Sequence, residues 1–288
     1  MANIREIKRR IRSVQGTAKI TKAMELVAAS KMRRAQEAAL AGRPYAERLT
    51  WVLADLAETL PLMDPDTLHP LLRRREVKST GIVLITPNRG LSGGLPTNII
   101  RRATDLVAEL NGAAKIVAVG RKGRDFFRRT DVPIRAEFSD LGDYPDYADA
   151  LPIARVVIDD YLAGEYDQVF LVYAFFVNTL SQEPRARQLL PVEPAQDAET
   201  MSVDYLYEPG RAEVLAQLLP RYVEMEIYEA VLEGMASEQS ARMVAMRNAT
   251  DAAKEMIDDL TLTYNKARQE QITKELLDIV GGVEGLKV

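Results

Sequence analysis

An apolar or small residue recurs at alternating steps of three and four along nearly all of the first 60 residues. The stripe runs through Ile4, Ile7, Ile11, Val14, Ala18, Thr21, Glu25, Ala28, Met32, Ala35, Ala39, Gly42, Ala46, Leu49, Leu53, Leu56 and Leu60. This spacing places a seam along one side of a helix and favours supercoiling with a second helix. We expect a kink at Pro44, because proline removes a backbone donor and crowds the preceding turn. The pattern predicts a coiled-coil helix over residues 1–60.

The other end of the chain repeats this spacing and predicts a second coiled-coil helix, over residues 209–288. Its seam runs through Met243, Met246, Thr250, Ala253, Ile257, Leu260, Tyr264 and Ala267, and the phase then shifts to Ile272, Leu276 and Ile279. We expect the helix to begin after Glu208-Pro209-Gly210 and to stop at Gly281 and Gly282. Such a helix is roughly 100 Å long at 1.5 Å per residue. Most of it cannot be covered by this chain alone.

Between the two helices the pattern changes to short apolar runs that alternate with helical stretches. The clearest strands are residues 81–86, 115–120 and 168–176, with helices expected at about 95–110, 121–129 and 147–163. Residues 181–202 are typical of a strand or hairpin followed by a returning linker. Alternating strands and helices predict a largely parallel sheet. The fold class is therefore a Rossmann-like α/β domain, over residues 77–202, inserted between two antiparallel coiled-coil helices.

Composition excludes several functional classes. The formal net charge of −4 and the pI near 5.4 argue against general nucleic-acid binding, which normally requires a basic domain. The chain has no cysteine, so it holds no disulfide, thiolate zinc site or cysteine nucleophile. No stretch is long and apolar enough to span a bilayer. We therefore expect any membrane association to pass through a partner.

A glycine-rich turn at residues 90–95 follows the first predicted strand and precedes a helix, a place where many folds bind phosphate. The turn lacks the G-x-G-x-x-G register, the chain contains no G-x-x-x-x-G-K-[ST], and no acidic residue closes the next strand. We expect a structural turn in which Ser92 or a nearby amide caps the helix, and no bound cofactor.

Three other sets of side chains have simple structural explanations. His69, the only histidine, lies in an apparent loop without the partners of a triad or a metal site. The carboxylates at 140, 143, 146 and 149 lack the spacing of a calcium loop and predict a solvated acidic loop. A basic run predicts an exposed helix face, and nucleic-acid contact is the weaker alternative: Arg121, Lys122, Arg124, Arg128 and Arg129.

The N-terminal segment is strongly basic, with ten Lys and Arg side chains against Glu6 and Glu25 in residues 1–34. Cations this dense repel one another unless acidic groups lie alongside. Either charge pairing with the acidic C-terminal helix accounts for all of them, or the segment also docks on an acidic partner.

Both ends of the chain resemble the gamma subunit of the F-type ATP synthase. The matching segments are KITKAMELVAASKMRRAQ (residues 19–36), RMVAMRNATDAA (242–253) and LTYNKARQEQITKELLDIVGG (262–282), with ITPNRGLSGGLPTN (85–98) in the middle. The chain departs from many members at Ser92, where cysteine is common, and at Pro87-Asn88. No segment resembles the chloroplast regulatory dithiol insertion.

The resemblance implies a central rotor shaft without an active site, metal or cofactor, which couples proton flow to ATP synthesis or hydrolysis. Its partners would be the alpha and beta subunits of the catalytic ring, the epsilon subunit and the ring of c subunits. The chain would be peripheral, on the cytoplasmic face of the cell membrane. By resemblance Arg268 and Gln269 contact a beta subunit, Met24 lies nearby, and Tyr207 and Glu208 lie near the c-subunit ring.

Two other functions compete with the rotor. One is a coiled-coil scaffold or adaptor without rotary function, which would not copurify with a hexameric ATPase. The other is a dinucleotide-dependent oxidoreductase built on the α/β insert, which the missing fingerprint disfavours and which titration with dinucleotides would reveal.

Overall fold

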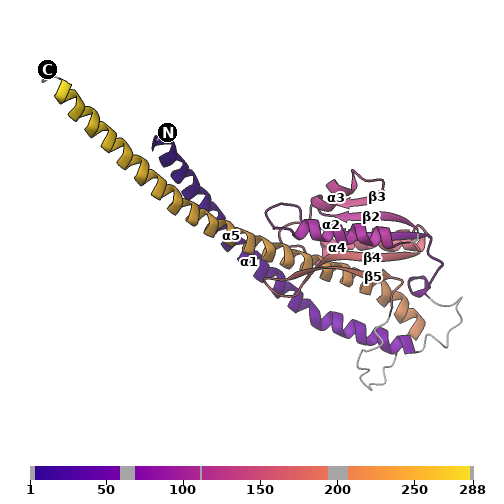
Figure 1. Cartoon of the computed structure of the whole chain (residues 1–288). Coiled ribbons are helices and arrows are strands. Elements are labelled where there is room, and N and C mark those ends of the chain that lie inside the picture. The colour runs from indigo at the N-terminus through magenta and orange to yellow at the C-terminus, as the bar shows by residue number, and fades with distance from the viewer. Residues whose placement is uncertain (1–3, 59–68, 111, 194–206, 286–288) are drawn as a thin grey trace. The chain divides into compact units, whose positions relative to one another are not determined.

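The computed structural model describes residues 4–58, 69–110, 112–193 and 207–285. It divides into two compact units, which are described separately here. The stem unit comprises residues 1–28 and 243–288, and the sheet unit comprises residues 29–242. Two long helices, α1 (Ile4–Glu58) and α5 (Arg211–Gly285), each contribute to both units (Figure 1). Among the described residues, no helix combines the length and the apolar character that crossing a membrane requires.

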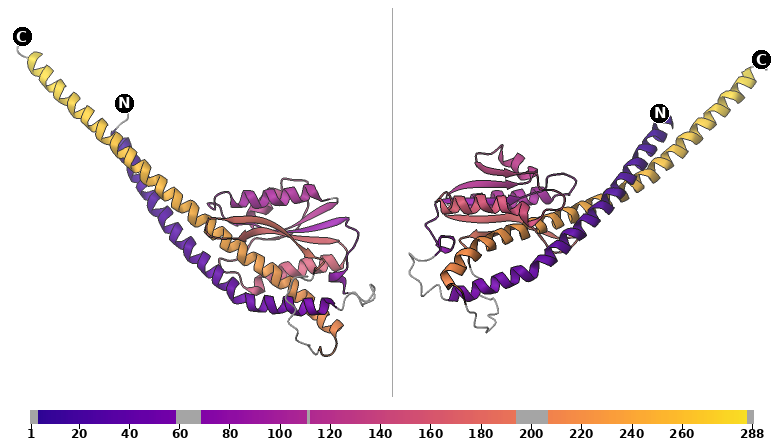
Figure 2. Two further views of the ribbon diagram at one scale, coloured as in Figure 1. Left: turned by 60° about the horizontal axis from the view of Figure 1, so that its bottom comes forward. Right: turned by 180° about the vertical axis from the view of Figure 1, so that it is seen from behind.

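In the stem unit α1 and α5 pack against each other and run antiparallel. Thr21 on α1 contacts Thr250 on α5, whereas Glu25, further along α1, contacts Arg247, which lies earlier on α5. The predicted seam is confirmed as far as Ala267, because its members there are buried or half-buried, including Ile7, Thr21, Met246 and Thr250, whereas the predicted continuation through Ile272, Leu276 and Ile279 is exposed. Both views of Figure 2 show the two helices side by side in this unit.

The sheet unit contains one five-stranded sheet in the order β3-β2-β1-β4-β5. Its strands are β1 (Ser79–Ile85), β2 (Ala113–Val119), β3 (Ile134–Phe138), β4 (Gln168–Phe176) and β5 (Gln182–Leu190). The first four are parallel, as predicted, and β5 is antiparallel to β4. Residues 82–85 of β1 form an uninterrupted apolar run, as expected for a strand covered on both faces of the sheet.

Helices cover the sheet on both faces. One face packs against α4 (Tyr147–Leu162) together with residues 49–56 of α1 and 215–231 of α5. The other packs against α2 (Leu95–Glu109) and α3 (Arg121–Phe127). α4 begins with a reciprocal capping box, in which the side chains of Asp146 and Asp149 accept backbone N–H groups. Two of the carboxylates predicted to form a solvated loop therefore start a helix instead.

Several predictions are confirmed and several need correction. The predicted strands are β1, β2 and β4, and the predicted start of the second helix at residue 211 is correct. The prediction that this helix stops at Gly281 and Gly282 is wrong, because α5 continues to Gly285. Glycine permits a left-handed cap but does not enforce one, and inside a helix it costs only about 1 kcal/mol. α1 remains helical through Pro44.

Two elements were not expected, namely β3 and the short 3-10 helix η2 (Pro70–Leu72). Residues 181–202 contain β5, and the rest of that prediction, from residue 194, lies outside the described residues, as does seam position Leu60. The division into residues 1–60, 77–202 and 209–288 stays a prediction, because the two compact units divide both long helices between them.

Candidate partner-binding stem

Polar side chains fix the register of the seam where residues 21–25 of α1 pack against residues 247–250 of α5. The hydroxyl oxygens of Thr21 and Thr250 lie 2.7 Å apart, and both side chains are buried. The carboxylate of Glu25, only 7% exposed, pairs with Lys22 at 2.9 Å and Arg247 at 3.3 Å. The hydrogen bond from Lys22 lowers the pKa of Glu25, against the effect of burial, and Arg247 adds to the lowering. If either helix slid along the other, the buried carboxylate would lose its ion-pair partner, so this cluster specifies one alignment of α1 with α5.

The outer part of α5 has no covering segment among the described residues. Every residue from 268 to 279 is exposed. Because Thr21 faces Thr250 in an antiparallel pair, the start of α1 at Ile4 lies level with about residue 267, at one residue of α5 per residue of α1. Four large apolar side chains nevertheless occur on this tail: Ile272 (44% exposed), Leu276 (57%), Leu277 (66%) and Ile279 (64%).

The stem part of α1 also exposes apolar side chains away from the seam. Ile20, Leu26 and Val27 are 55% to 63% exposed, and Ile20 and Val27 are seven residues apart, so they share one face of the helix. Clustered apolar side chains on a protein surface mark interaction sites more often than isolated ones do. These residues lie outside the predicted seam, although their seven-residue spacing is visible in the sequence.

Charge pairing within the chain accounts for only part of the basic segment. Arg10 pairs with Glu6, and Lys22 pairs with Glu25. Four exposed cations make no ion pair within the described ranges: Lys8, Arg9, Arg12 and Lys19. The expectation that pairing with α5 would account for all of them is therefore wrong, and these charges face solvent in the stem unit.

The five residues predicted to contact partners lie in two different units. Met24 is half-buried beside the seam, and Arg268 and Gln269 are exposed directly after the last seam residue, Ala267. Tyr207 belongs to the sheet unit, where its hydroxyl donates to Asp55 and its ring lies 5.3 Å from the guanidinium carbon of Arg211. Glu208 is exposed next to it.

The glycine-rich turn is a structural turn, but not the predicted one. α2 begins after Gly94 without a side-chain cap, and Ser92 is buried with its hydroxyl unpaired. Capping by Ser92 is therefore wrong. Leu91 and Gly93 both have positive φ, at 67° and 59°, which makes the turn tight enough to aim α2 back along the sheet.

The remaining chemical candidates have structural partners. His69 caps η2, because its Nδ1 accepts the N–H of Leu71 at 3.3 Å. Asp143 pairs with Lys31 at 2.7 Å. On α3, Arg124 and Arg128 pair with Asp125 and Glu137. Within the part of the chain that the structure describes, no group of three or more potential metal ligands occurs.

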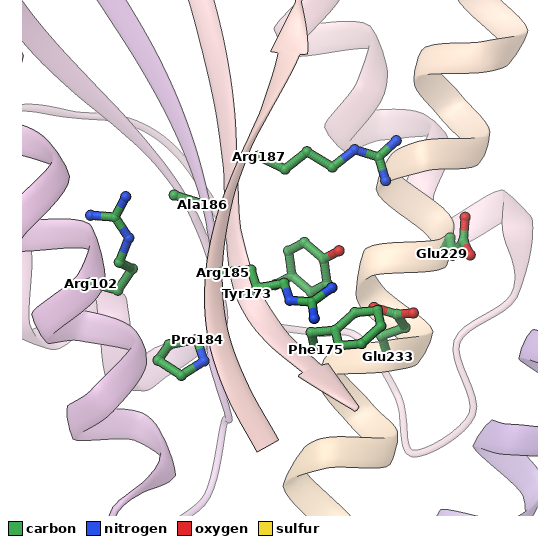
Figure 3. Close-up of a pocket in the computed structure, with 9 residues that line it drawn as sticks. All are labelled: Arg102, Tyr173, Phe175, Pro184, Arg185, Ala186, Arg187, Glu229 and Glu233. Atoms are coloured by element: carbon green, nitrogen blue, oxygen red, sulfur yellow. The ribbon is translucent and has the colours of Figure 1, made fainter. Parts of the chain in front are cut away.

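A cavity of about 500 Å³ lies at the edge of the sheet, and its lining mixes both charges (Figure 3). Arg185 and Arg187 of β5 and Tyr173 and Phe175 of β4 face Glu229 and Glu233 of α5 there. Burial raises the pKa of Glu233 to about 7, with a further rise from Glu229, and one of its oxygens is buried without a partner. No sequence pattern marked Glu233, because its environment comes from strands far away in the chain.

Comparison with known proteins gives full-length matches. The family model described as ATP synthase matches residues 3–286. The ATP synthase gamma chain of Dehalococcoides mccartyi is 59% identical over 286 residues, which cover 99% of this chain and 100% of the relative. A solved structure of the Tetrahymena thermophila mitochondrial ATP synthase central stalk and c-ring matches with a TM-score of 0.60 and 28% identity, over 80% of this chain and 99% of that one.

A Euglena gracilis mitochondrial ATP synthase structure supports the fold over a greater length. Its TM-score is 0.65 at 20% identity, covering 98% of this chain and 94% of that chain. Fold similarity and sequence identity both extend over the stem helices and the sheet. The chain belongs to the ATP synthase gamma-chain family.

Proposed function

We propose that this chain is the central rotor shaft of a rotary, proton-translocating ATP synthase. The observation that carries the proposal is the uncovered stem: residues 268–279 of α5 are all exposed and include four large apolar side chains. A soluble chain that leaves such a tail bare is built to be covered by another chain. The full-length gamma-chain relatives and the resemblance to a solved central stalk support the catalytic ring as the partner that covers this tail.

The partners follow from this role. Alternating alpha and beta subunits would surround the stem, with Arg268 and Gln269 on a beta subunit and Met24 close to the same region. The sheet unit would bind the epsilon subunit and the c-subunit ring, with Tyr207 and Glu208 toward that ring. The chain would then be held at the cytoplasmic face of the cell membrane through the complex and would carry no catalytic residue.

Coupling would come from the asymmetry of the shaft. One two-helix stem inside a ring with threefold repetition presents a different face to each catalytic site. A ligand or partner shifts a conformational equilibrium only by its difference in affinity for the two states. Contacts of the stem that differ among the three sites would therefore bias each toward a different conformation, and nucleotide binding would in turn bias the angle of the stem.

A pull-down from membranes tests the proposal. An affinity tag on the sheet unit, at the exposed α3 surface, leaves the stem free. We expect a hexameric ATPase and a membrane ring to copurify with the tagged chain, and a variant truncated after Ala267 to recover less of the hexamer. Recovery of unrelated proteins without the hexamer would support a coiled-coil adaptor and overturn the rotor assignment.

A further inference from the structure

We propose that residues 234–242 of α5 form a rigid joint that locks α5 to the sheet, so that both turn as one body. The inference concerns the sheet unit alone and rests on the rotor function proposed above. It assigns a positioning role to Ser237 and Ser240, two buried serines that neither the sequence motifs nor the family resemblance single out.

The joint fills a place where open α/β sheets bind ligands. The strand order reverses between the neighbouring strands β1 and β4: the chain continues from β1 to β2 on one side, and from β4 to β5 on the other. Ligands usually bind in the crevice beyond the carboxyl ends of strands at such a point. Here α5 occupies that edge, and a Cβ on Gly234 would meet the Ile85 side chain, at the end of β1, at 3.1 Å.

Two fully buried hydroxyls of α5 bond to backbone carbonyls at this edge. The Ser237 hydroxyl donates to the carbonyl of Ala174 at 3.0 Å, and the Ser240 hydroxyl donates to the carbonyl of Thr179 at 2.7 Å. The carbonyl of Ala174 needs a donor from outside the sheet. Pairing of β4 with β1 ends at Val172, and the residue opposite Ala174 on β5 is Pro184, which has no N–H.

The turn that receives Ser240 is itself well ordered by hydrogen bonds. The side chain of Asn178 accepts the N–H groups of Leu180 and Ser181. Gln182 donates to the carbonyls of Asn178 and Thr179 and to the Ser240 hydroxyl, at 3.0 to 3.3 Å. This hydrogen-bond network makes the turn that accepts the Ser240 hydroxyl rigid.

A third contact extends the joint to the glycine-rich turn. Arg242, 8% exposed, donates to the carbonyl of Gly90 at 3.1 Å and pairs with Glu238 at 2.7 Å. The three receiving carbonyls belong to three separate segments at one edge of the sheet. A helix bonded to three segments resists both sliding and rolling against the sheet.

The test is the double variant Ser237→Ala and Ser240→Ala in the assembled complex. Alanine favours helix, so α5 itself is not weakened. We expect amide exchange of the 178–181 turn to rise about fivefold, because the double variant removes the hydrogen bond from Ser240 to Thr179. We also expect fewer protons pumped per ATP hydrolysed, with hydrolysis retained. The control is Thr104→Ala, which removes an exposed hydroxyl of the sheet unit that bonds only within its own helix, α2.

A variant with an engineered disulfide distinguishes a loss of the joint from a failure of the double variant to fold. Because the chain has no cysteine, Thr179→Cys and Ser240→Cys introduce the only thiols in it, at two residues in direct contact. Added to Ser237→Ala, oxidation should restore the pumping ratio and reduction should lower it again. Loss of pumping on oxidation would overturn the proposal, as would equal pumping by the double variant and wild type in complexes that assemble. Failure of the wild-type chain to copurify with the ring would instead reject the rotor function.

Discussion

The sheet unit and the stem unit satisfy their apolar residues in different ways. In the sheet unit, strands β1, β2 and β4 are buried between helices of the same unit, and side chains such as Leu171 and Ile153 are at most 1% exposed. In the stem unit, burial is confined to one seam, and beyond Ala267 it stops. The sheet unit buries these strands with its own helices, whereas the stem leaves part of its apolar surface exposed.

The largest expected effect comes from truncating a core side chain of the sheet unit. Leu171→Ala should lower the free energy of unfolding by about 2–5 kcal/mol, because it removes buried methyl groups and leaves a cavity. Urea unfolding followed by the fluorescence of Trp51 measures this loss. Leu277→Ala, on the exposed tail, is the matched control and should change the free energy by less than about 0.5 kcal/mol. Similar losses in the two variants would erase the distinction between the units.

A pH dependence in the sheet unit should follow from Glu233. Its folded pKa is about 7, raised from 4.5, so the folded state holds a proton that the unfolded state releases between those values. Stability therefore falls as pH rises through this window, by up to about 3 kcal/mol in total. Glu233→Gln cannot ionise, so its stability relative to wild type should increase between pH 5 and pH 8. A difference that stays constant between pH 5 and pH 8 would contradict the raised pKa.

The stem should show the opposite sign, because the pKa of Glu25 is lowered from 4.5. Its contribution is present above the unfolded pKa and is lost as pH falls through the folded value. Glu25→Gln should cost about 1 kcal/mol at neutral pH, a modest amount because Lys22 and Arg247 are largely exposed. The difference between variant and wild type should vanish in acid. A difference that persists at the lowest pH would point to packing instead of charge.

The smallest effect on the free chain is expected at the start of the tail. Arg268→Ala combined with Gln269→Ala should leave helicity and melting within about 0.5 kcal/mol of wild type, since both side chains are exposed. In the assembled complex the same pair should impair turnover or assembly, because an arginine fork and an amide suit a carboxylate partner. Normal turnover and assembly in this double variant would show that Arg268 and Gln269 belong to an exposed helix face without a partner contact.

What the sequence could predict depends on whether a residue is placed by its neighbours in the chain or by distant segments, and not on which unit it belongs to. The seam from Ile4 to Leu56 and the strands β1, β2 and β4 follow from periodicity alone, because each residue there is placed by its own neighbours in the chain. β3 alternates three apolar residues with Arg135 and Glu137, but it is only five residues long, and so short a run becomes a strand through pairing with β2. Sequence patterning does not reveal such tertiary pairing.

The site residues show the same limit. Arg268 and Gln269 were named through the family resemblance, and their contact with a partner stays a prediction; both are exposed directly after the seam residue Ala267. Ser237, Ser240 and Glu233 could not be named, since a serine or glutamate inside a long helix carries no local signal of what it faces. The error at Gly281 and Gly282 has a related cause: a glycine pair allows a stop, but the surrounding helix decides whether it occurs.

Rotation of the sheet unit during ATP hydrolysis tests the rotor function most directly. Lys122→Cys, exposed on α3, gives a chain without other cysteines a single attachment point for a bead. With the catalytic ring fixed to a surface and ATP added, we predict stepwise rotation of the bead in one direction, which stops when ATP is removed. ATP hydrolysis by the immobilised complex with the bead stationary or moving at random would contradict a rotary shaft.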